Sequence, residues 1–210
     1  MLTIPTVPNI SLRIPPNVNT WGSIELSYDC AKWVIDNNIK GDFVETGTAA
    51  GQQLGAMCLA GERHGWGFDS FEGVPWAGEH DTLQPGIGVK DISKHGILET
   101  SGISSYSKEA CDYNLNQWGL KDYTLIKGWF QDTLPKWKRK RISVLRLDGD
   151  LYESTIVALE YLYPLLSKNG ILIIDDWTLP GCMKAFHVYF GGKVFPKFLL
   201  QENGTYWQKK

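Results

Sequence analysis

Short apolar segments alternate with segments of helical periodicity along this chain, and few folds are compatible with that order. The expected strands lie at residues 42–45, 65–69, 123–127, 142–148 and 170–175. The last of these (GILIID) is almost entirely apolar, which is typical of a parallel strand buried on both faces. Strands that alternate with helices at this spacing predict an α/β fold, with a doubly wound, mostly parallel sheet and helices on both faces.

Periodicity and capping signals also predict the helices. We expect them at residues 23–37, 51–59, 107–119 and 153–166. Ser107 is the expected N-cap of the third helix, and Pro164 is expected to kink the last turn of the fourth. Residues 205–208 are suited to a final, antiparallel strand.

The length and composition favour one domain. A chain of 210 residues, 43% of them hydrophobic, can bury about 70% of its unfolded surface, so we expect a single domain over residues 1–210. Residues 1–20 contain four prolines and are expected to form an extended N-terminal arm. Residues 72–102 are glycine-rich and too long for a simple connection, which is typical of a functional loop, here a substrate loop.

Charge and cysteine usage exclude several classes of protein. The 21 Lys and Arg residues nearly balance the 23 Asp and Glu residues, which argues against a nucleic-acid partner. The sequence has neither a signal-peptide pattern nor an apolar run of about 18 residues, so we expect a cytoplasmic protein with no membrane partner. The four cysteines form no CxxC pair and are expected to be buried thiols.

Acidic residues end four of the five expected strands, and ligands of doubly wound sheets bind beyond these ends. Those residues are Glu45, Asp69, Asp148 and Asp175. After the first strand, Gly47 and Gly51 allow a tight turn, and Asp69 is spaced to accept hydrogen bonds from a ribose. The Gly-x-x-x-Gly spacing fits S-adenosylmethionine better than a pyrophosphate cofactor, although a purely structural turn is equally consistent with it.

A carboxylate cluster is expected at the ends of the fourth and fifth strands. If these strands are neighbours, about 4.8 Å apart, Asp148, Asp175 and Asp176 can reach one ion. Oxygen ligands favour Mg²⁺, Mn²⁺ or Ca²⁺ over Zn²⁺. The alternative is structural, with Asp175 and Asp176 capping a helix and Asp148 forming a turn.

Several segments resemble the macrocin O-methyltransferase (TylF/NovP-type) family, whose members methylate sugar hydroxyls of antibiotics. They include GDFVETGTAAG, FDSFEGVP, LIKGWFQDTLP, GILIIDDW and, most specifically, LRLDGDLYEST, and the resemblance spans roughly residues 21–209. It implies a class I, S-adenosylmethionine-dependent, Rossmann-like methyltransferase fold. The loop at residues 48–51 departs from the family, because it reads TAAG where an aromatic residue, an arginine and paired glycines are usual.

The resemblance also implies roles for particular residues. Mg²⁺ (or Mn²⁺) would be held by the positions matching Asp148, Asp175 and Asp176, and Asp150 would be the general base. The methionine part of the cofactor would be contacted by Glu45, Thr46 and Gly47, and its ribose by Asp69 and Ser70. Its adenine end would be lined by Gly128, Trp129 and Phe130.

We therefore expect a Mg²⁺-dependent O-methyltransferase that acts on a hydroxyl of a sugar or another vicinal-diol small molecule. Two alternatives remain open: a metal-dependent glycosyltransferase that uses Asp148-Gly149-Asp150, and a phenolic O-methyltransferase of the catechol type. A homodimer is compatible with the sequence. Candidates to stack on an acceptor ring are Trp76, Tyr152 and Trp177, although large aromatic residues more often belong to the core. His80 and His95 are expected to be uninvolved surface histidines.

Overall fold

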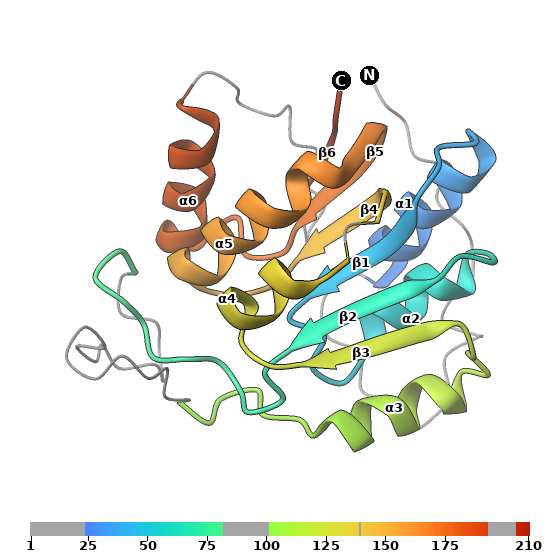
Figure 1. Ribbon diagram of the computed structural model, residues 1–210, viewed down its shortest axis with the longest axis horizontal. Coiled ribbons are helices and arrows are strands. Elements are labelled where there is room, and N and C mark those ends of the chain that lie inside the picture. Colours follow the sequence, from blue (N-terminus) through green and yellow to red (C-terminus); the bar gives the residue numbers. More distant parts are fainter. Residues whose placement is uncertain (1–23, 82–100, 139, 193–204) are drawn as a thin grey trace.

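A six-stranded sheet forms the centre of the computed structural model, which describes residues 24–81, 101–138, 140–192 and 205–210 (Figure 1). The strand order is β3-β2-β1-β4-β5-β6. The first five strands pair in parallel, and β6 pairs with β5 in the antiparallel direction. The strands are β1 (Asp42–Thr46), β2 (Gly65–Asp69), β3 (Tyr123–Lys127), β4 (Ile142–Leu147), β5 (Leu166–Ile174) and β6 (Thr205–Gln208).

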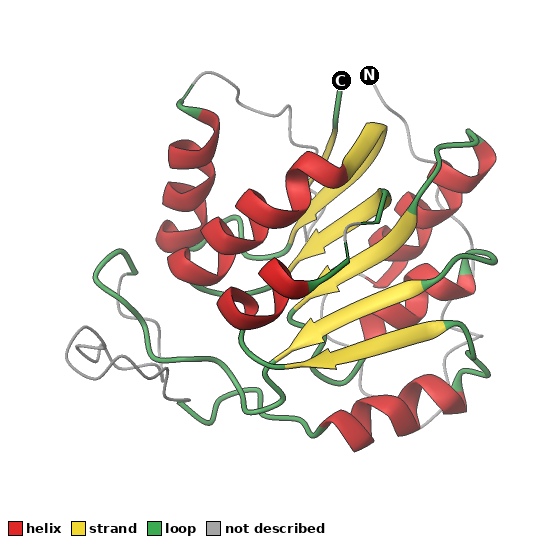
Figure 2. Ribbon diagram, in the orientation of Figure 1, coloured by secondary structure: helices red, strands yellow, loops and turns green. Residues whose placement is uncertain are grey.

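Helices cover both faces of the sheet (Figure 2). One face carries α1 (Ile24–Asp36), α2 (Gln52–Leu59) and α3 (Lys108–Gln117). The other carries α4 (Phe130–Thr133), α5 (Tyr152–Leu162) and α6 (Pro180–Phe190). Short 3-10 turns follow α4 at Leu134–Lys136 and α5 at Tyr163–Leu165. The expected doubly wound α/β fold is therefore confirmed. Among the described helices, none is both long and apolar enough to span a membrane.

Each central strand divides its side chains between two cores, because successive side chains of a strand point to opposite faces. In β1, Phe43 packs in the core under α1 and α2, whereas Val44 packs in the core under α5 and α6. In β4, Val144 and Leu145 divide in the same way. All four residues are fully buried, which accounts for the apolar runs in the sequence.

The register of the central strands aligns their carboxyl ends. Leu147 of β4 pairs with Thr46 of β1 and with Ile174 of β5. The next residues extend the ladder, because Asp148 N–H donates to the Thr46 carbonyl (3.0 Å) and Asp175 N–H donates to the Leu147 carbonyl (2.9 Å). The strand order also reverses between β1 and β4, so these acidic residues lie where doubly wound sheets bind ligands.

Most predicted elements are confirmed, including β6 and the Ser107 cap, whose hydroxyl accepts the Ala110 N–H at 3.1 Å. The fourth predicted helix is wrong at its end: α5 stops at Leu162, and β5 already begins at Leu166. Pro164 cannot donate a backbone hydrogen bond and lies in the intervening 3-10 turn. The sequence patterns predicted no helix at α6. The predicted arm at residues 1–20 and most of the predicted substrate loop lie outside the described residues.

Candidate active site

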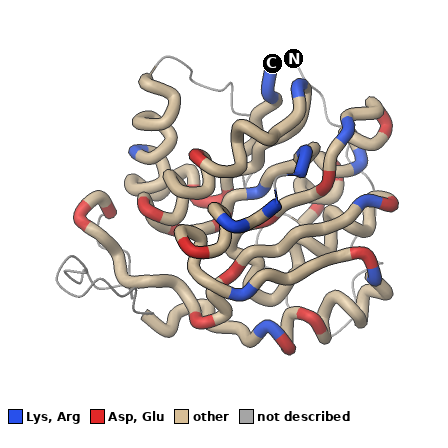
Figure 3. Tube along the Cα trace, in the orientation of Figure 1, with Lys and Arg blue, Asp and Glu red and all other residues tan. Residues whose placement is uncertain are grey.

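A cavity of about 630 Å³ lies beyond the carboxyl ends of the strands, lined by residues at or after the ends of β1, β2, β3, β4 and β5. Several acidic positions lie at this edge of the molecule (Figure 3). The lining includes the predicted residues Glu45, Gly47, Asp69, Ser70, Trp129, Phe130, Asp148, Asp150, Asp175 and Asp176. The structure thus brings together residues from five separate segments. Thr46 and Gly128 lie outside the lining formed by the described residues.

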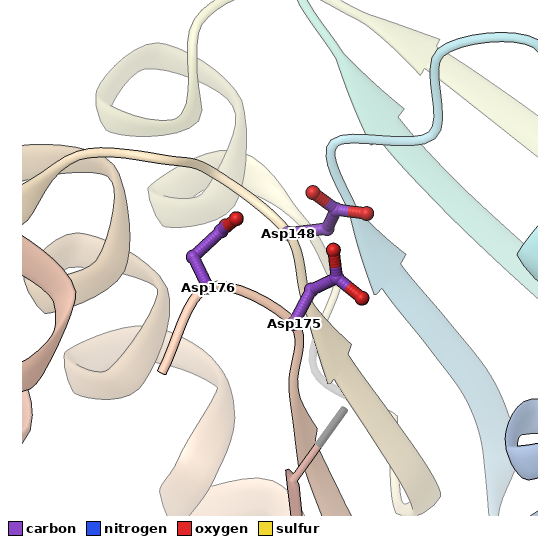
Figure 4. A group of neighbouring side chains, drawn as sticks. All are labelled: Asp148, Asp175 and Asp176. Carbon is purple, nitrogen blue, oxygen red and sulfur yellow. The ribbon is translucent and has the colours of Figure 1, made fainter. Parts of the chain in front are cut away.

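Three carboxylates meet at one end of this cavity (Figure 4). One oxygen each from Asp148, Asp175 and Asp176 lies within 4.8 Å of the others. This grouping was predicted from the strand ends, and the pairing of β4 with β5 produces it. Their hydrogen bonds engage one oxygen of each carboxylate: Oδ2 of Asp148, Oδ1 of Asp175 and Oδ2 of Asp176. Three carboxylate oxygens this close together give a donor set that suits a hard divalent cation.

A buried arginine, which was not predicted from the sequence, lies beneath this cluster. Arg146 is 2% exposed, and its Nη2 donates to Asp148 (3.0 Å) and to Asp175 (2.5 Å). Its Nε donates to Glu45 at 3.1 Å, because Glu45 and Arg146 are register partners on β1 and β4. The available signal was a single charged residue within an otherwise apolar strand (ISVLRL).

The cluster carries more negative charge than Arg146 neutralises. Burial alone would lower the pKa of the guanidinium, but the three carboxylates around it raise that pKa. Burial, and then the charges of Asp150 and Asp175, raise the pKa of Asp176 to about 7. Burial also raises the pKa of Asp148 well above its usual range. A bound cation would relieve this repulsion, so the residues present fit a metal ion.

Asp150 occupies a strained turn between β4 and α5. Its φ is +59°, in the left-handed region that costs most residues about 1–2 kcal/mol but that Asp tolerates better. Its backbone N–H donates to Asp176 Oδ2 at 2.8 Å, which ties the turn to the carboxylate cluster. Burial, and then the charge of Asp175, raise the pKa of Asp150 to about 6. This side chain is therefore mostly ionised above neutral pH and can accept a proton there.

The loop after β1 forms a neighbouring part of the cavity wall. Gly47 has a φ of +81°, and a Cβ at this position would lie 1.5 Å from the Asp148 carbonyl oxygen, so only glycine fits. Asp69 holds the loop, since its carboxylate accepts the N–H groups of Ala49 (2.7 Å) and Phe71 (2.6 Å). The pKa of Asp69 is raised by burial, against the lowering effect of these amides.

Glu45 and Thr46 are more enclosed than a ligand-contacting role requires. The Glu45 side chain is 1% exposed, and its Oε2 accepts the Leu54 N–H at 3.0 Å. Burial raises the pKa of Glu45 to about 8. The Thr46 hydroxyl is buried without a hydrogen-bond partner among the described residues. The contacts proposed for these two residues with the cofactor stay predictions.

The candidate stacking residues have different surroundings. Trp76 lines the cavity. Trp177 packs edge-on against Phe186 of α6, with ring centroids 5.2 Å apart. The Tyr152 ring packs against His80, with centroids 4.4 Å apart, so His80 takes part in tertiary packing rather than lying idle. His95 lies outside the described residues. Of the three aromatic candidates, Trp76 alone belongs to the cavity lining formed by the described residues.

The sequence and the fold are similar to those of known methyltransferases. A tetracenomycin 4'-O-methyltransferase of Streptomyces olivaceus is 36% identical over 189 residues, which cover 85% of this chain and 70% of that protein. The demethyldecarbamoylnovobiocin O-methyltransferase of Streptomyces niveus is 34% identical over 212 residues, covering 93% of this chain and 77% of that protein. The solved structure of the O-methyltransferase NovP superposes with a TM-score of 0.73 at 32% identity, covering 89% of this chain and 79% of that chain.

These similarities confirm the fold and exclude one of the two alternatives left open by the sequence. A calicheamicin methyltransferase structure, 22% identical, superposes with a TM-score of 0.70, so the class I methyltransferase fold is confirmed. The glycosyltransferase alternative is excluded, because the matched family transfers methyl groups. The family described as macrocin O-methyltransferase (TylF) matches residues 24–209. The chain is therefore an O-methyltransferase and belongs to the macrocin O-methyltransferase (TylF) family.

Proposed function

We propose that the protein transfers a methyl group from S-adenosylmethionine to a sugar hydroxyl of a small natural product, and that the reaction requires Mg²⁺. The observation that carries the proposal is one cavity that joins a glycine-containing cofactor loop to three clustered carboxylates. The names of the relatives support the acceptor class, since one describes a 4'-O-methyltransferase of a rhamnosyl tetracenomycin and another a mycinamicin 3''-O-methyltransferase.

Each end of the cavity has its own role in this proposal. The cofactor occupies the end formed by Gly47, Asp69 and Ser70, and Trp129 and Phe130 line its adenine. The acceptor occupies the end beside Asp148 and Asp175, with Trp76 against its ring. Stacking on an aromatic ring suits the apolar face of a sugar and also suits a phenol.

The chain's residues then perform three tasks. Asp148, Asp175 and Asp176 hold the ion, and Arg146 fixes the orientation of the first two. The carboxylate of Asp150 accepts the proton of the acceptor hydroxyl, a role that suits a base with a pKa of about 6. The cavity walls orient the hydroxyl toward the methyl donor and limit the access of water. When bound, S-adenosylmethionine supplies the methyl group, and Mg²⁺ supplies positive charge that stabilises the ionised hydroxyl oxygen.

A methyl-transfer assay tests this function. Purified protein is incubated with methyl-labelled S-adenosylmethionine and a panel of rhamnosides, free sugars and catechols. We expect glycosides to be methylated and Asp150→Asn to lower the rate constant about 100-fold or more. If catechols were methylated in preference to every glycoside, the acceptor would be a phenol and the proposed sugar acceptor would be wrong. A single domain over residues 1–210, a homodimer and a cytoplasmic location stay predictions.

A further inference from the structure

Asp81, in the loop after β2, reaches across the molecule to the beginning of α5. Asp81 is only 8% exposed. Its Oδ1 accepts the N–H of Tyr152, the first residue of α5, at 2.8 Å. Its Oδ2 accepts the Gly78 N–H at 3.0 Å. Seventy-one residues separate Asp81 from Tyr152 in the sequence, so this hydrogen bond joins two distant parts of the cavity wall.

The first turn of α6 leaves space for this carboxylate. Gly181 packs so closely that a Cβ there would lie 1.8 Å from Asp81 Oδ1 and 3.0 Å from the Tyr152 backbone nitrogen. A glycine inside a helix destabilises that helix by about 1 kcal/mol relative to alanine, so glycine is expected there only where a larger side chain would not fit. Here the small size is needed, because Asp81, Tyr152 and Gly181 occupy one tightly packed junction.

The junction lies directly after the turn that carries Asp150. The N-cap residue of α5, Leu151, has no polar side chain, and the Asp81 carboxylate takes the place of a capping side chain. On the amino-terminal side of this turn, the N–H of Asp150 donates to the Asp176 carboxylate. Two carboxylates from distant segments therefore hold the backbone on either side of a residue with a φ of +59°.

A second contact runs between the same segments. The His80 ring packs edge-on against the Tyr152 ring, with centroids 4.4 Å apart. Lys184 Nζ lies 2.8 Å from His80 Nδ1 and 5.7 Å from the centre of the Tyr152 ring. The loop is thus fixed against both α5 and α6, immediately beyond Trp76 on the cavity wall.

We propose that Asp81 is a positioning residue: it fixes the start of α5 and thereby holds Asp150 in place for proton transfer. The inference rests on the proposed function, in which Asp150 is the base. The same bond sets the position of the loop that carries Trp76, so it couples the acceptor side of the cavity to the base. A carboxylate suits this task because it accepts hydrogen bonds at both oxygens, and the two donors are backbone N–H groups.

Two substitutions disturb the junction by different routes. Asp81→Asn keeps the shape but replaces one accepting oxygen with an NH₂ group that faces an N–H donor. Gly181→Ala keeps the carboxylate but pushes it away from Tyr152, and Gly181 is not a residue of the cavity lining. We expect each to lower kcat about 10- to 100-fold, because small displacements of a base have large effects, and to leave the Kd of S-adenosylmethionine within about twofold. The double variant should be no slower than the slower single variant, because both act on one contact.

Two further variants separate positioning from general loss of stability. Ser167→Ala removes the hydrogen bond from the Ser167 hydroxyl to the Lys40 carbonyl (2.6 Å), at the end of β5 opposite the cavity, and should lower the melting temperature without lowering kcat. Compared with Tyr152→Ala, Tyr152→Pro also replaces the N–H donor with a ring CH₂ group that faces Asp81 Oδ1, and proline is accepted at the first position of a helix. We expect Tyr152→Pro to be at least about fivefold slower than Tyr152→Ala.

Hydrogen exchange gives a readout that does not depend on turnover. Asp81→Asn and Gly181→Ala should speed exchange of the amides in residues 149–153, and Ser167→Ala should not. Normal kcat and normal exchange in folded Asp81→Asn and Gly181→Ala would overturn the inference. If Asp81→Asn fails to fold, equal kcat values for Tyr152→Pro and Tyr152→Ala would overturn it. Wild-type protein that binds S-adenosylmethionine but methylates no acceptor would instead refute the proposed function, and the exchange data would still test the junction.

Discussion

Arg146 determines the charge balance of the site at the scale of single residues. Its guanidinium holds three carboxylates that come from the ends of three strands. Removing one partner of a buried ion pair destabilises the fold, because the remaining buried charge then has neither solvent nor a counterion around it. Arg146 is therefore the internal cation of this group of carboxylates.

Replacement of Arg146 tests this balance. Arg146→Met leaves buried carboxylates without their internal cation, so we expect the free energy of unfolding to fall by about 3–5 kcal/mol. Arg146→Lys keeps the positive charge but lacks the planar set of N–H donors of the guanidinium. Its free energy of unfolding should therefore lie between those of the wild type and Arg146→Met. Urea unfolding at pH 7 with chelator present measures both. Equal stability of Arg146→Met and the wild type would show that these ion pairs make no net contribution to the free energy of unfolding.

The raised carboxyl pKa values predict how stability depends on pH. The pKa of Asp176 is about 7 in the fold, against about 4 in an unfolded chain. Between these values the folded state holds a proton that the unfolded state has released, so stability falls as pH rises from about 4 to about 7. Thermal melts of metal-free protein from pH 5 to pH 8 should show this loss, and Asp176→Asn should show a smaller one. Parallel curves for the two proteins would contradict the assignment.

The interactions that were not predicted from the sequence join residues far apart in the chain. Arg146 and Glu45 are 101 positions apart, and Asp81 and Tyr152 are 71 apart. Acidic residues at strand ends could be grouped from the sequence, because parallel strands end at one edge of a sheet. Which charged residue pairs with which depends on strand order and register, and neither follows from local patterns.

At the scale of elements, the loop between β1 and α2 joins the cofactor end of the cavity to the carboxylates. It passes so close to Asp148 that Gly47 has no room for a side chain. Local patterns predicted the strand, the glycine turn and the helix here, since each depends on neighbouring residues. They did not predict α6, because Pro180-Gly181 indicates a turn, although proline is also accepted in the first turn of a helix.

Two alanine substitutions separate close packing from backbone strain. Gly47→Ala brings a Cβ against the Asp148 carbonyl, so the loop must move, and we expect S-adenosylmethionine to bind at least about tenfold more weakly. Gly119 has a similar φ of +77°, but an added Cβ there would meet no described atom within 4 Å beyond its chain neighbours. Gly119→Ala should therefore cost only about 1 kcal/mol of stability. Titration calorimetry and thermal melts measure the two effects. Equal cofactor affinity in both variants would show that the close approach to Asp148 is unimportant.

At the scale of the whole molecule, the reversal of strand order between β1 and β4 brings the two halves of the site together. The proposed cofactor loop follows β1, and the carboxylates follow β4 and β5. The bond from Asp81 to Tyr152 then attaches the loop after β2 to the same edge. A chain with 21 basic and 23 acidic residues thereby concentrates acidic groups in one cavity while remaining close to neutral overall.

The proposed function requires that the cavity carboxylates hold a divalent ion, and that methyl transfer needs this ion; this is the claim to test. The most direct test is the initial rate of methyl transfer at increasing free Mg²⁺ after treatment with chelator. We predict that chelation lowers the rate about 100-fold or more, that Mg²⁺ restores it, and that Asp175→Asn shows little recovery. Asp36→Asn, on the exposed end of α1, serves as the matched control and should recover fully. A wild-type rate that chelator leaves unchanged would contradict the claim.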